Sequence, residues 1–490
     1  MGYEVLGIAS QAIQAQELAL NVTGNNMANA TTPGYSAESV DLTENAPSPN
    51  AAMPGTLIGN GVTATAVTRA TNAFLSSSVR NQTSAVGYAT ALTQGLNQVQ
   101  SVFQEPQNGG LAEMMNQFSQ AWLALSQSPT SLSARENVIQ DGQTLASTFN
   151  STAATLFSEE NSVNQNIRTA VQQINQLAGQ IGRLNGQIAT VSTSGQQPLD
   201  LLDQRDQLLN KLSRLTNISY TAGPANSVDV YIGAHPLVTG STVYQMQIAP
   251  VGVPGSSSSG TGSSIFTADQ PVWSDNSSPV QVQSGSLAGN IALLYNQTVN
   301  GSSGGPVSAG YLTHYGQQLD NLANSLMTTV NNGQQSGLDL SGNPGANFFT
   351  GTSAGTIAVS AAMTPDGVAA ASPPPSGSSF DTGDGSNATN IYNALSTGTM
   401  TIGSSVGTTL NGYYQSLVGQ VGLNGQNANN LQTDGTNTLT SLNNELQGVT
   451  GVDLNQQSVN MIQEQQSFEA AAKLIATEQS TIQSLMSAVG

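Results

Sequence analysis

The sequence predicts a mainly α-helical protein with a β-rich middle: paired N- and C-terminal coiled-coil helices, a helical-bundle shaft and an inserted β domain. Three observations support this fold class. Large apolar residues recur every seven positions at both ends of the chain, helical stripes fill the region behind the N-terminal segment, and alternating β-branched residues appear near the middle. A length of 490 residues also suggests about three domains.

The two terminal segments carry the heptads. The apolar heptad positions are Leu6, Ile13, Leu20 and Met27 at the N-terminus and Leu454, Met461, Phe468, Ile475 and Ile482 at the C-terminus. This spacing is typical of a helix that packs along another helix, so these residues form the predicted assembly interface. Asp453 stands where an N-cap is expected, with Gln456 at the capping-box position. Two amphipathic helices on an ordinary core would show the same periodicity, but such helices are marginal alone and need a partner face.

The region behind the N-terminal helix is first extended and then helical. Up to Arg69 the chain is interrupted by prolines, and the Thr-Pro-Gly-Tyr run at 32–35 places proline and glycine where a type II turn needs them. Residues 72–215 show the periodicity of long helices lying side by side, which predicts the shaft. The helical pattern returns near 311–330 and at 408–447.

The middle of the chain has a different texture. Residues 227–232 alternate and are β-branched, which predicts a strand, and the Gly/Ser-rich run at 255–264 predicts a flexible loop. A second region of small residues, 348–391, is also expected to be β, with an interruption at the three prolines 373–375. The predicted organisation is a terminal coiled-coil domain of residues 1–60 with 451–490, a helical shaft of 61–215 with 284–333 and 406–450, and a β-rich outer domain of 216–283 with 334–405.

Composition excludes several classes of partner. Charged residues make up 8% of the chain, against about 25% in ordinary soluble domains. The net charge is -19 and no basic cluster exists, so neither nucleic acid nor an anionic membrane surface is an expected partner. There are no cysteines, which rules out disulfides and thiolate metal sites. The N-terminus lacks the features of a cleavable signal peptide, so export would use a different route.

No pattern predicts catalysis, a cofactor or a metal. Ser303 and Ser353 fit G-x-S-x-G, which would make the chain a hydrolase only if an acid and then a histidine followed in order. The two histidines, His235 and His314, do not complete that order, and they lack a zinc-binding spacing. The loop after Asp339 has too few carboxylates for calcium and is expected to be a polar turn.

Three aspartates follow one another at helical spacing in the shaft. Asp200, Asp203 and Asp206 surround Arg205, and such a pattern on a helix is typical of an exposed face with local ion pairing.

Two short segments carry a resemblance to a known family. Residues 20–35 resemble the N-terminal signature of the flagellar axial family, which includes the rod, hook and hook-associated proteins, and residues 452–470 resemble its C-terminal motif. Interior segments, above all 199–208, 285–289, 337–349 and 413–419, resemble the hook-associated members. The signature residues are Asn25, Asn26, Asn29, Thr32, Pro33, Gly34 and Tyr35, together with Asp203, Gln204 and Arg205. The family often has a basic residue just after the turn, where this chain has Ser36.

The resemblance implies a function and a location. It implies a structural adaptor, secreted through the flagellar type III channel, that sits at the junction between hook and filament. Its terminal helices would order on polymerisation. The implied partners are further copies of itself in a ring, the hook protein, the second junction protein on the flagellin side of the filament, and a cytoplasmic export chaperone at the C-terminal region. A hook or distal rod subunit is the alternative within the family, and a secreted surface adhesin is the alternative outside it.

Overall fold

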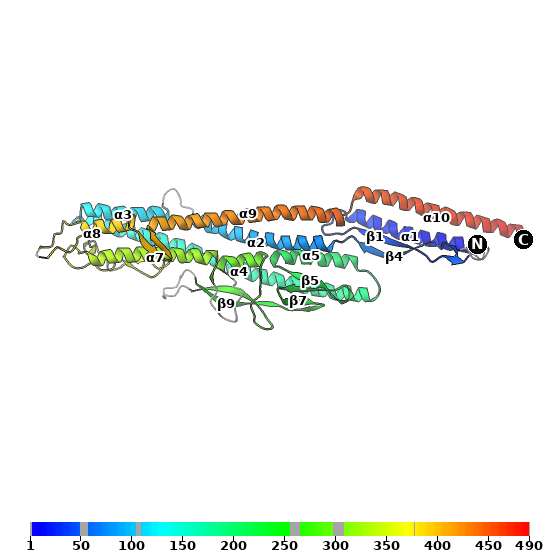
Figure 1. Ribbon diagram of the computed structural model, residues 1–490, viewed down its shortest axis with the longest axis horizontal. Coiled ribbons are helices and arrows are strands. Elements are labelled where there is room, and N and C mark those ends of the chain that lie inside the picture. Colours follow the sequence, from blue (N-terminus) through cyan, green and yellow to red (C-terminus); the bar gives the residue numbers. More distant parts are fainter. Residues whose placement is uncertain are drawn as a thin grey trace.

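The computed structural model describes residues 2–49, 57–103, 109–254, 265–296, 308–376 and 378–489. The protein is an elongated rod of helices, and both chain termini lie at the same end of it (Figure 1). The predicted fold class, mainly α with paired terminal helices and small sheets in the middle, is confirmed. Within the described ranges no helix is long and apolar enough to cross a membrane.

The terminal unit contains two helices and a β ribbon. Helix α1 (Gly2–Asn29) packs on α10 (Leu454–Val489) and on the antiparallel ribbon of β1 (Glu38–Glu44) and β4 (Val62–Arg69). A second, two-residue pair joins β2 (Ser48–Pro49) and β3 (Leu57–Ile58). The two helices are antiparallel, because positions that advance along α1 bond to positions that retreat along α10. The predicted Asp453 cap is present, since its carboxylate accepts the N–H groups of Asn455 and Gln456.

The shaft is a bundle of long helices, as the periodicity predicted. Its helices are α2 (Ala73–Phe103), α3 (Leu111–Gln127), α4 (Leu132–Thr193), α5 (Leu199–Leu215), α6 (Ser286–Leu294), α7 (Tyr311–Ser336) and α9 (Leu410–Thr450). Helix α4 has 62 residues, which gives a length of about 93 Å, and α9 runs along α2 (Figure 1). A continuous apolar core joins these helices, with Phe118, Trp122 and Phe348 in mutual ring contact near one end.

The first β-rich part lies along the C-terminal half of α4. It is a four-stranded antiparallel sheet of β5 (Ser219–Ala222), β6 (Val228–Ile232), β7 (His235–Thr239) and β8 (Thr242–Val243), followed by the ribbon of β9 (Met246–Pro254) and β10 (Ile265–Trp273). Asn175 and Asn185 on α4 donate to the carbonyls of Met246 and Val228, which fastens ribbon and sheet to the helix. A two-residue pair, β11 (Tyr295–Asn296) with β12 (Ser308–Ala309), links α6 to α7. The strand predicted at 227–232 is confirmed, and the loop predicted at 255–264 falls outside the described residues.

The expectation of a β region at 348–391 is wrong for most of its length. Among its described residues it contains only the two-residue strands β13 (Phe349–Thr350) and β14 (Ala358–Val359), and helix α8 (Ser386–Ser396) begins within it. Asp384 accepts hydrogen bonds from the N–H groups of Ser372 and Ser386. Just before the region, the predicted polar turn is present, because Asp339 Oδ1 accepts the N–H groups of Ser341 and Asn343. Side chains that satisfy the backbone locally make turns instead of strands. A last hairpin, β15 (Met400–Ile402) with β16 (Ser405–Thr408), precedes α9.

Candidate assembly interface

Helix α10 presents one line of residues to α1. One line of positions is half-buried, with Ala471 buried, and is spaced alternately by four and three: Gln457, Met461, Glu464, Phe468, Ala471, Ile475, Glu478 and Ile482. The predicted residues from Met461 to Ile482 therefore all lie on the line that faces α1. Leu454, at the start of the helix, is 49% exposed.

The buried apolar residues of helix α1 are small, namely Ala9, Ala15, Ala19 and Val22. The predicted line of Leu6, Ile13, Leu20 and Met27 is half-buried and runs beside the buried one. We call these four residues the α1 flank. Small side chains allow the two helices to lie close together, and the α1 flank keeps part of its large apolar surface exposed.

A polar layer interrupts the coil near the shaft. Thr23 and Asn26, which are 4% and 1% exposed, occupy buried positions on α1. Thr23 Oγ1 donates to Glu464 Oε1 at 3.0 Å, and Asn26 Nδ2 donates to Gln457 Oε1 at 3.3 Å. Glu464 Oε2 is buried and receives no hydrogen bond from the residues that the structure describes. Burial raises the pKa of the Glu464 carboxyl, and the Thr23 hydroxyl opposes this shift only in part.

The signature turn is organised around Asn26. Its amide donates to Glu38 O at 2.7 Å, while its Oδ1 accepts from Glu38 N at 2.8 Å and from Tyr35 Oη at 2.9 Å. The predicted type II turn is confirmed, because Gly34 has a φ of 79° and Tyr35 N donates to Thr32 O at 3.2 Å. Burial, followed by the nearby carboxylate of Glu38, raises the pKa of the Tyr35 phenol well above its usual range.

The remaining signature residues close the end of α1. Asn29 donates to the side-chain oxygen of Asn25 at 2.9 Å, and Thr32 Oγ1 donates to Asn29 Oδ1 at 3.1 Å. These exposed side chains hold the chain as it leaves the helix and enters the turn.

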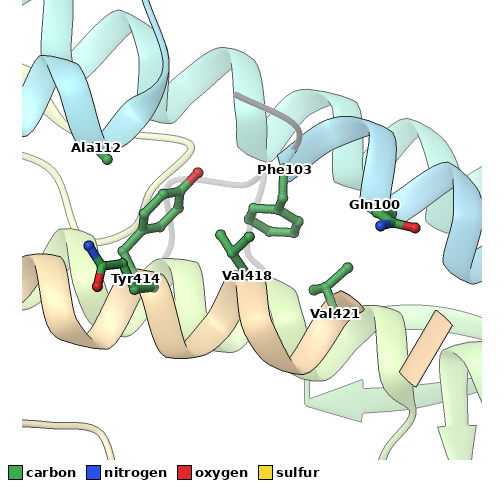
Figure 2. Close-up of a pocket in the computed structure, with 7 residues that line it drawn as sticks. Gln100, Phe103, Ala112, Tyr414, Val418 and Val421 are labelled. Atoms are coloured by element: carbon green, nitrogen blue, oxygen red, sulfur yellow. The ribbon is translucent and has the colours of Figure 1, made fainter. Parts of the chain in front are cut away.

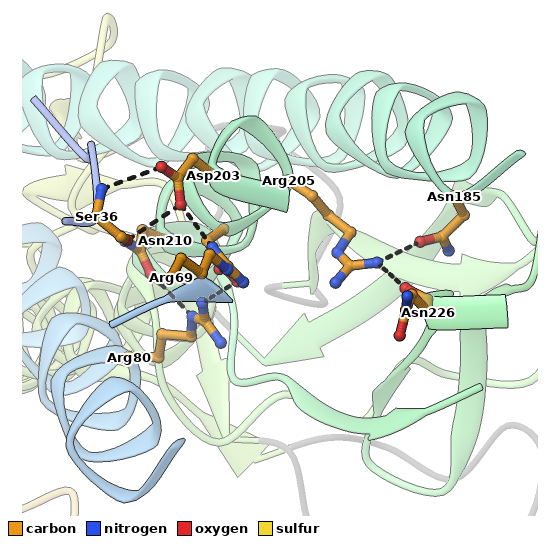
Figure 3. Close-up of polar contacts among 9 residues, drawn as sticks. Ser36, Arg69, Arg80, Asn185, Asp203, Arg205, Asn210 and Asn226 are labelled. Atoms are coloured by element: carbon orange, nitrogen blue, oxygen red, sulfur yellow. Dashed lines mark hydrogen bonds and ion pairs between the residues drawn. The ribbon is translucent and has the colours of Figure 1, made fainter. Parts of the chain in front are cut away.

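The two halves of the signature, far apart in sequence, meet at the neck between terminal unit and shaft. Arg69, the last residue of β4, pairs with Asp203 at 2.6 Å and with Asp206 at 2.8 Å. Ser36, just after the turn, donates to Asp203 through its N–H and its hydroxyl, at 3.0 and 3.1 Å. Arg80 of α2 pairs with Asp206 at 2.8 Å (Figure 3). We call this set, together with Asn210, the neck network.

The expectation that the α5 aspartates form an exposed face with local ion pairing is wrong for Asp203 and Asp206. Asp203 is buried and its partners come from a different part of the chain. Arg205 points elsewhere, donating to Asn226 O at 2.5 Å and Asn185 Oδ1 at 3.4 Å, and burial lowers its pKa (Figure 3). Gln204 is exposed. A helix-face argument considers only neighbours in the same helix, and here the cations arrive through tertiary packing.

Arg69, Arg80, Asn210 and Ser36 were not predicted as site residues. The sequence offers one indication of these residues. The chain has only nine lysines and arginines, so each basic residue beside a predicted helix is a candidate for an ion pair. The partners themselves lie more than 120 residues away in sequence, as in the Arg80–Asp206 pair with a separation of 126. Only the fold brings them together.

The candidate catalytic residues form no site. Ser353 is fully buried and its hydroxyl bonds to Thr356, as expected of a turn. His235 bonds to Asp275, and His314 bonds to Gln318. Ser303 lies outside the described residues. Among those residues no group of His, Asp and Glu side chains is suited to a metal ion.

A cavity of about 410 Å³ opens between α2, α3 and α9. Phe103, Tyr414, Val418 and Val421 line most of it, with Gln100 at one edge (Figure 2). Among the described residues, the lining of the cavity carries no charged side chain.

Three known protein families match different parts of the chain. Residues 96–349 match the flagellar hook-associated protein FlgK helical domain. Residues 6–35 match the flagella basal body rod protein family, and residues 449–488 match the C-terminal family of basal body rod FlgEFG proteins.

Whole proteins are also similar. Flagellar hook-associated protein 1 of Bacillus subtilis is 30% identical over 100% of this chain and 98% of its own length. The protein of the same name from Salmonella typhimurium is 25% identical over 70% of this chain and 58% of its own. The solved structure of the flagellar hook junction protein FlgK from Burkholderia pseudomallei shares the fold, with a TM-score of 0.63, 17% identity, and coverage of 76% of this chain and 100% of that one.

A coil made from both chain ends, with rod-protein motifs in each, defines a structural subunit of the flagellar axis. More specifically, the chain belongs to the flagellar hook-associated protein 1 family. This membership confirms the predicted class: a structural protein of the bacterial flagellum outside the cell, at the hook–filament junction, and not an enzyme.

Proposed function

We propose that the chain joins hook to filament by polymerising through its terminal coil. One observation carries this proposal: the α1 flank and the exposed Ile462 and Leu474 of α10 leave large apolar side chains only partly covered within a single chain. Burying a fully exposed side chain of this size is worth about 1.5–3 kcal/mol, and each of these half-covered side chains can gain part of that amount. The coil therefore has apolar surface available for neighbouring subunits.

Within a single chain, the coil formed by α1 and α10 buries little apolar surface. Among the described side chains of α10, the only buried apolar one is the small Ala471, and those of α1 are alanines and one valine. Helices with so little buried surface are marginal in isolation. Ordering of the terminal unit on assembly follows from this balance, because contacts with neighbours supply the missing burial.

The proposed partners and domain organisation follow from the family and the sequence. The partners are copies of the chain in a ring, the hook protein, the second junction protein on the filament side and an export chaperone for the C-terminal region. The sequence suggests domains of residues 1–60 with 451–490, 61–215 with 284–333 and 406–450, and 216–283 with 334–405, and we place β4 (Val62–Arg69) with the first of these because it pairs with β1. The two segments of the last domain contact different stretches of α4, near Arg135 and near Asn185.

Gene deletion in the source bacterium tests the function. We expect hooks that lack filaments, seen by electron microscopy, and flagellin lost to the medium. Missing hooks would assign the chain to the rod or hook, and normal filaments would overturn the proposal.

Complementation tests the interface. Deletion cells complemented with the Ile13→Asn, Leu20→Asn double variant should carry at least about tenfold fewer filaments than cells complemented with the unsubstituted chain. The reason is that two apolar contacts with neighbouring subunits are lost. The matched control replaces the exposed neighbours Gln14 and Asn21 of the same helix by Ser. Equal filament numbers for the two double variants would show that the α1 flank is not part of the interface.

A further inference from the structure

We infer that the shaft carries a preformed receptor for the terminal unit, made by Arg80, Asp203, Asp206 and Asn210, and that its ligand is the chain's own Arg69 and signature turn. This inference deepens the proposed function and rests on its claim that the terminal unit orders on assembly. It assigns a binding role to the aspartates of α5.

The receptor is held together within the shaft. Arg80 is 5% exposed, its Nε donates to Asn210 Oδ1 at 2.9 Å, and its Nη2 pairs with Asp206 at 2.8 Å. Its guanidinium also lies over the ring of Tyr220, 4.7 Å from the centroid. These contacts join α2, α5 and β5 and involve no residue of the terminal unit, so the receptor keeps its geometry without the ligand.

Asp203 is the part of the receptor that the shaft leaves unsatisfied. Its carboxylate has three partners among the described residues, namely Ser36 N, Ser36 Oγ and Arg69 Nη1, and all belong to the terminal unit. Without that unit the receptor bears two aspartates against one arginine, a net charge of -1. A carboxylate in this position has a strong need for a cation and hydrogen-bond donors.

The terminal unit presents the complementary groups. Arg69 supplies the second positive charge and reaches both aspartates with separate nitrogens, at 2.6 and 2.8 Å. Gln207 of α5 donates to Pro33 O at 3.0 Å, and an added Cβ on Gly34 would come within 2.7 Å of the Gln207 side chain. The receptor therefore recognises the terminal unit both by charge and by close contact at the turn. It binds the signature turn in its ordered form.

The test uses the full-length protein bound to isolated hooks. Asp203→Asn removes the charge on the shaft side, and Arg69→Gln removes it on the terminal side without touching the shaft. Asp200→Asn is the control, since Asp200 is exposed one turn earlier on the same helix. Co-sedimentation gives the affinity for hooks, hydrogen exchange reports order in α1, and thermal unfolding reports shaft stability.

We expect each single variant to bind hooks at least about tenfold more weakly and to exchange faster in α1, because the Arg69–Asp203 pair is lost. The shaft should unfold at the unchanged temperature. The double variant should be no weaker than Arg69→Gln alone, since that variant already loses both ion pairs of Arg69. The control should match the unsubstituted chain.

Unchanged hook binding of both single variants would overturn the inference, and so would additive losses in the double variant. A lower unfolding temperature of the shaft in Arg69→Gln would also contradict it, because the receptor would then depend on its ligand. Failure of the unsubstituted chain to bind hooks contradicts the proposed function instead, so the two failures are distinguishable.

Discussion

At the scale of single residues, buried carboxylates of the terminal unit and the neck are neutralised in different ways. Asp203 faces an arginine and two donors of Ser36, whereas Glu464 has only the hydroxyl of Thr23. A buried carboxylate without a cation destabilises the folded state when it is ionised. The polar layer of the coil should therefore respond to pH.

The stability of the coil is expected to fall as pH rises. The pKa of Glu464 is raised in the folded state, so folding favours the protonated form. Stability is complete below the ordinary pKa of a glutamate and declines as pH rises through that value toward the raised one. Hydrogen exchange of α10 in the full-length protein, between about pH 4 and about pH 8, should show this decline, and Glu464→Gln should abolish it.

The matched control for this prediction is Glu469→Gln, at an exposed position of the same helix. It should leave the pH dependence of the α10 exchange unchanged. The same decline in Glu464→Gln as in the unsubstituted protein would show that another group is responsible, and Glu38, whose pKa is also raised by burial, would be the next candidate.

Several site residues were predictable from sequence and others were not. The turn at Gly34 and the Asp453 cap follow from local chemistry, which a short sequence window contains. The role of Asn26 does not, because its partners on β1 and α10 come from separate elements. The α1 flank was predicted because large side chains dominate a heptad pattern, whereas the buried apolar residues of α1 are three alanines and a valine.

At the scale of elements, glycines set how closely α6 lies on α2. A Cβ on Gly289 would come within 2.6 Å of Tyr88 O, and one on Gly87 within 3.2 Å of Ser286 N, the first residue of α6. Gly285 precedes α6 with a φ of 88°, which favours glycine. The run at 285–289, which resembles the hook-associated proteins, is therefore required by packing.

Gly289→Ala is expected to destabilise the shaft by about 1–3 kcal/mol, because the backbone of α2 must move to admit the methyl group. Gly179→Ala, in α4, is the control: its nearest neighbour is the Arg183 side chain at 3.7 Å, so it should stabilise the shaft by up to about 1 kcal/mol. Urea unfolding measures both free energies. Equal values for the two variants would contradict the packing role.

The helices were predictable and the irregular region was not. Long apolar periodicity identified α2, α4, α7 and α9, since a helix of several turns repeats its pattern many times. Between 348 and 391 small residues and β propensity suggested strands, but Asp384 and its neighbours bond to nearby backbone. Short-range side-chain bonds of this kind leave no periodic trace.

At the scale of the whole molecule, the net charge of -19 bears on assembly. Copies in a ring repel one another, while their proposed contacts are apolar and the ion pairs of the neck lie within one chain. Self-association should therefore strengthen when salt rises from about 20 mM to about 300 mM, because screening weakens the repulsion. Analytical ultracentrifugation measures this, and weaker association at high salt would indicate ion pairs between copies.

The neck has a mechanical consequence. Two parts of a protein that are connected by a single chain segment can rotate relative to each other, since single bonds rotate. Here the chain crosses twice, between Arg69 and Asn72 and between Thr450 and Asp453, and Ala37 N bonds to Thr450 O at 2.8 Å to tie the crossings together. Twisting the terminal unit about the rod axis would wind these crossings around each other and shear the Arg69–Asp203 pair. The neck therefore resists rotation of the terminal unit relative to the helical bundle, so it transmits torque between them.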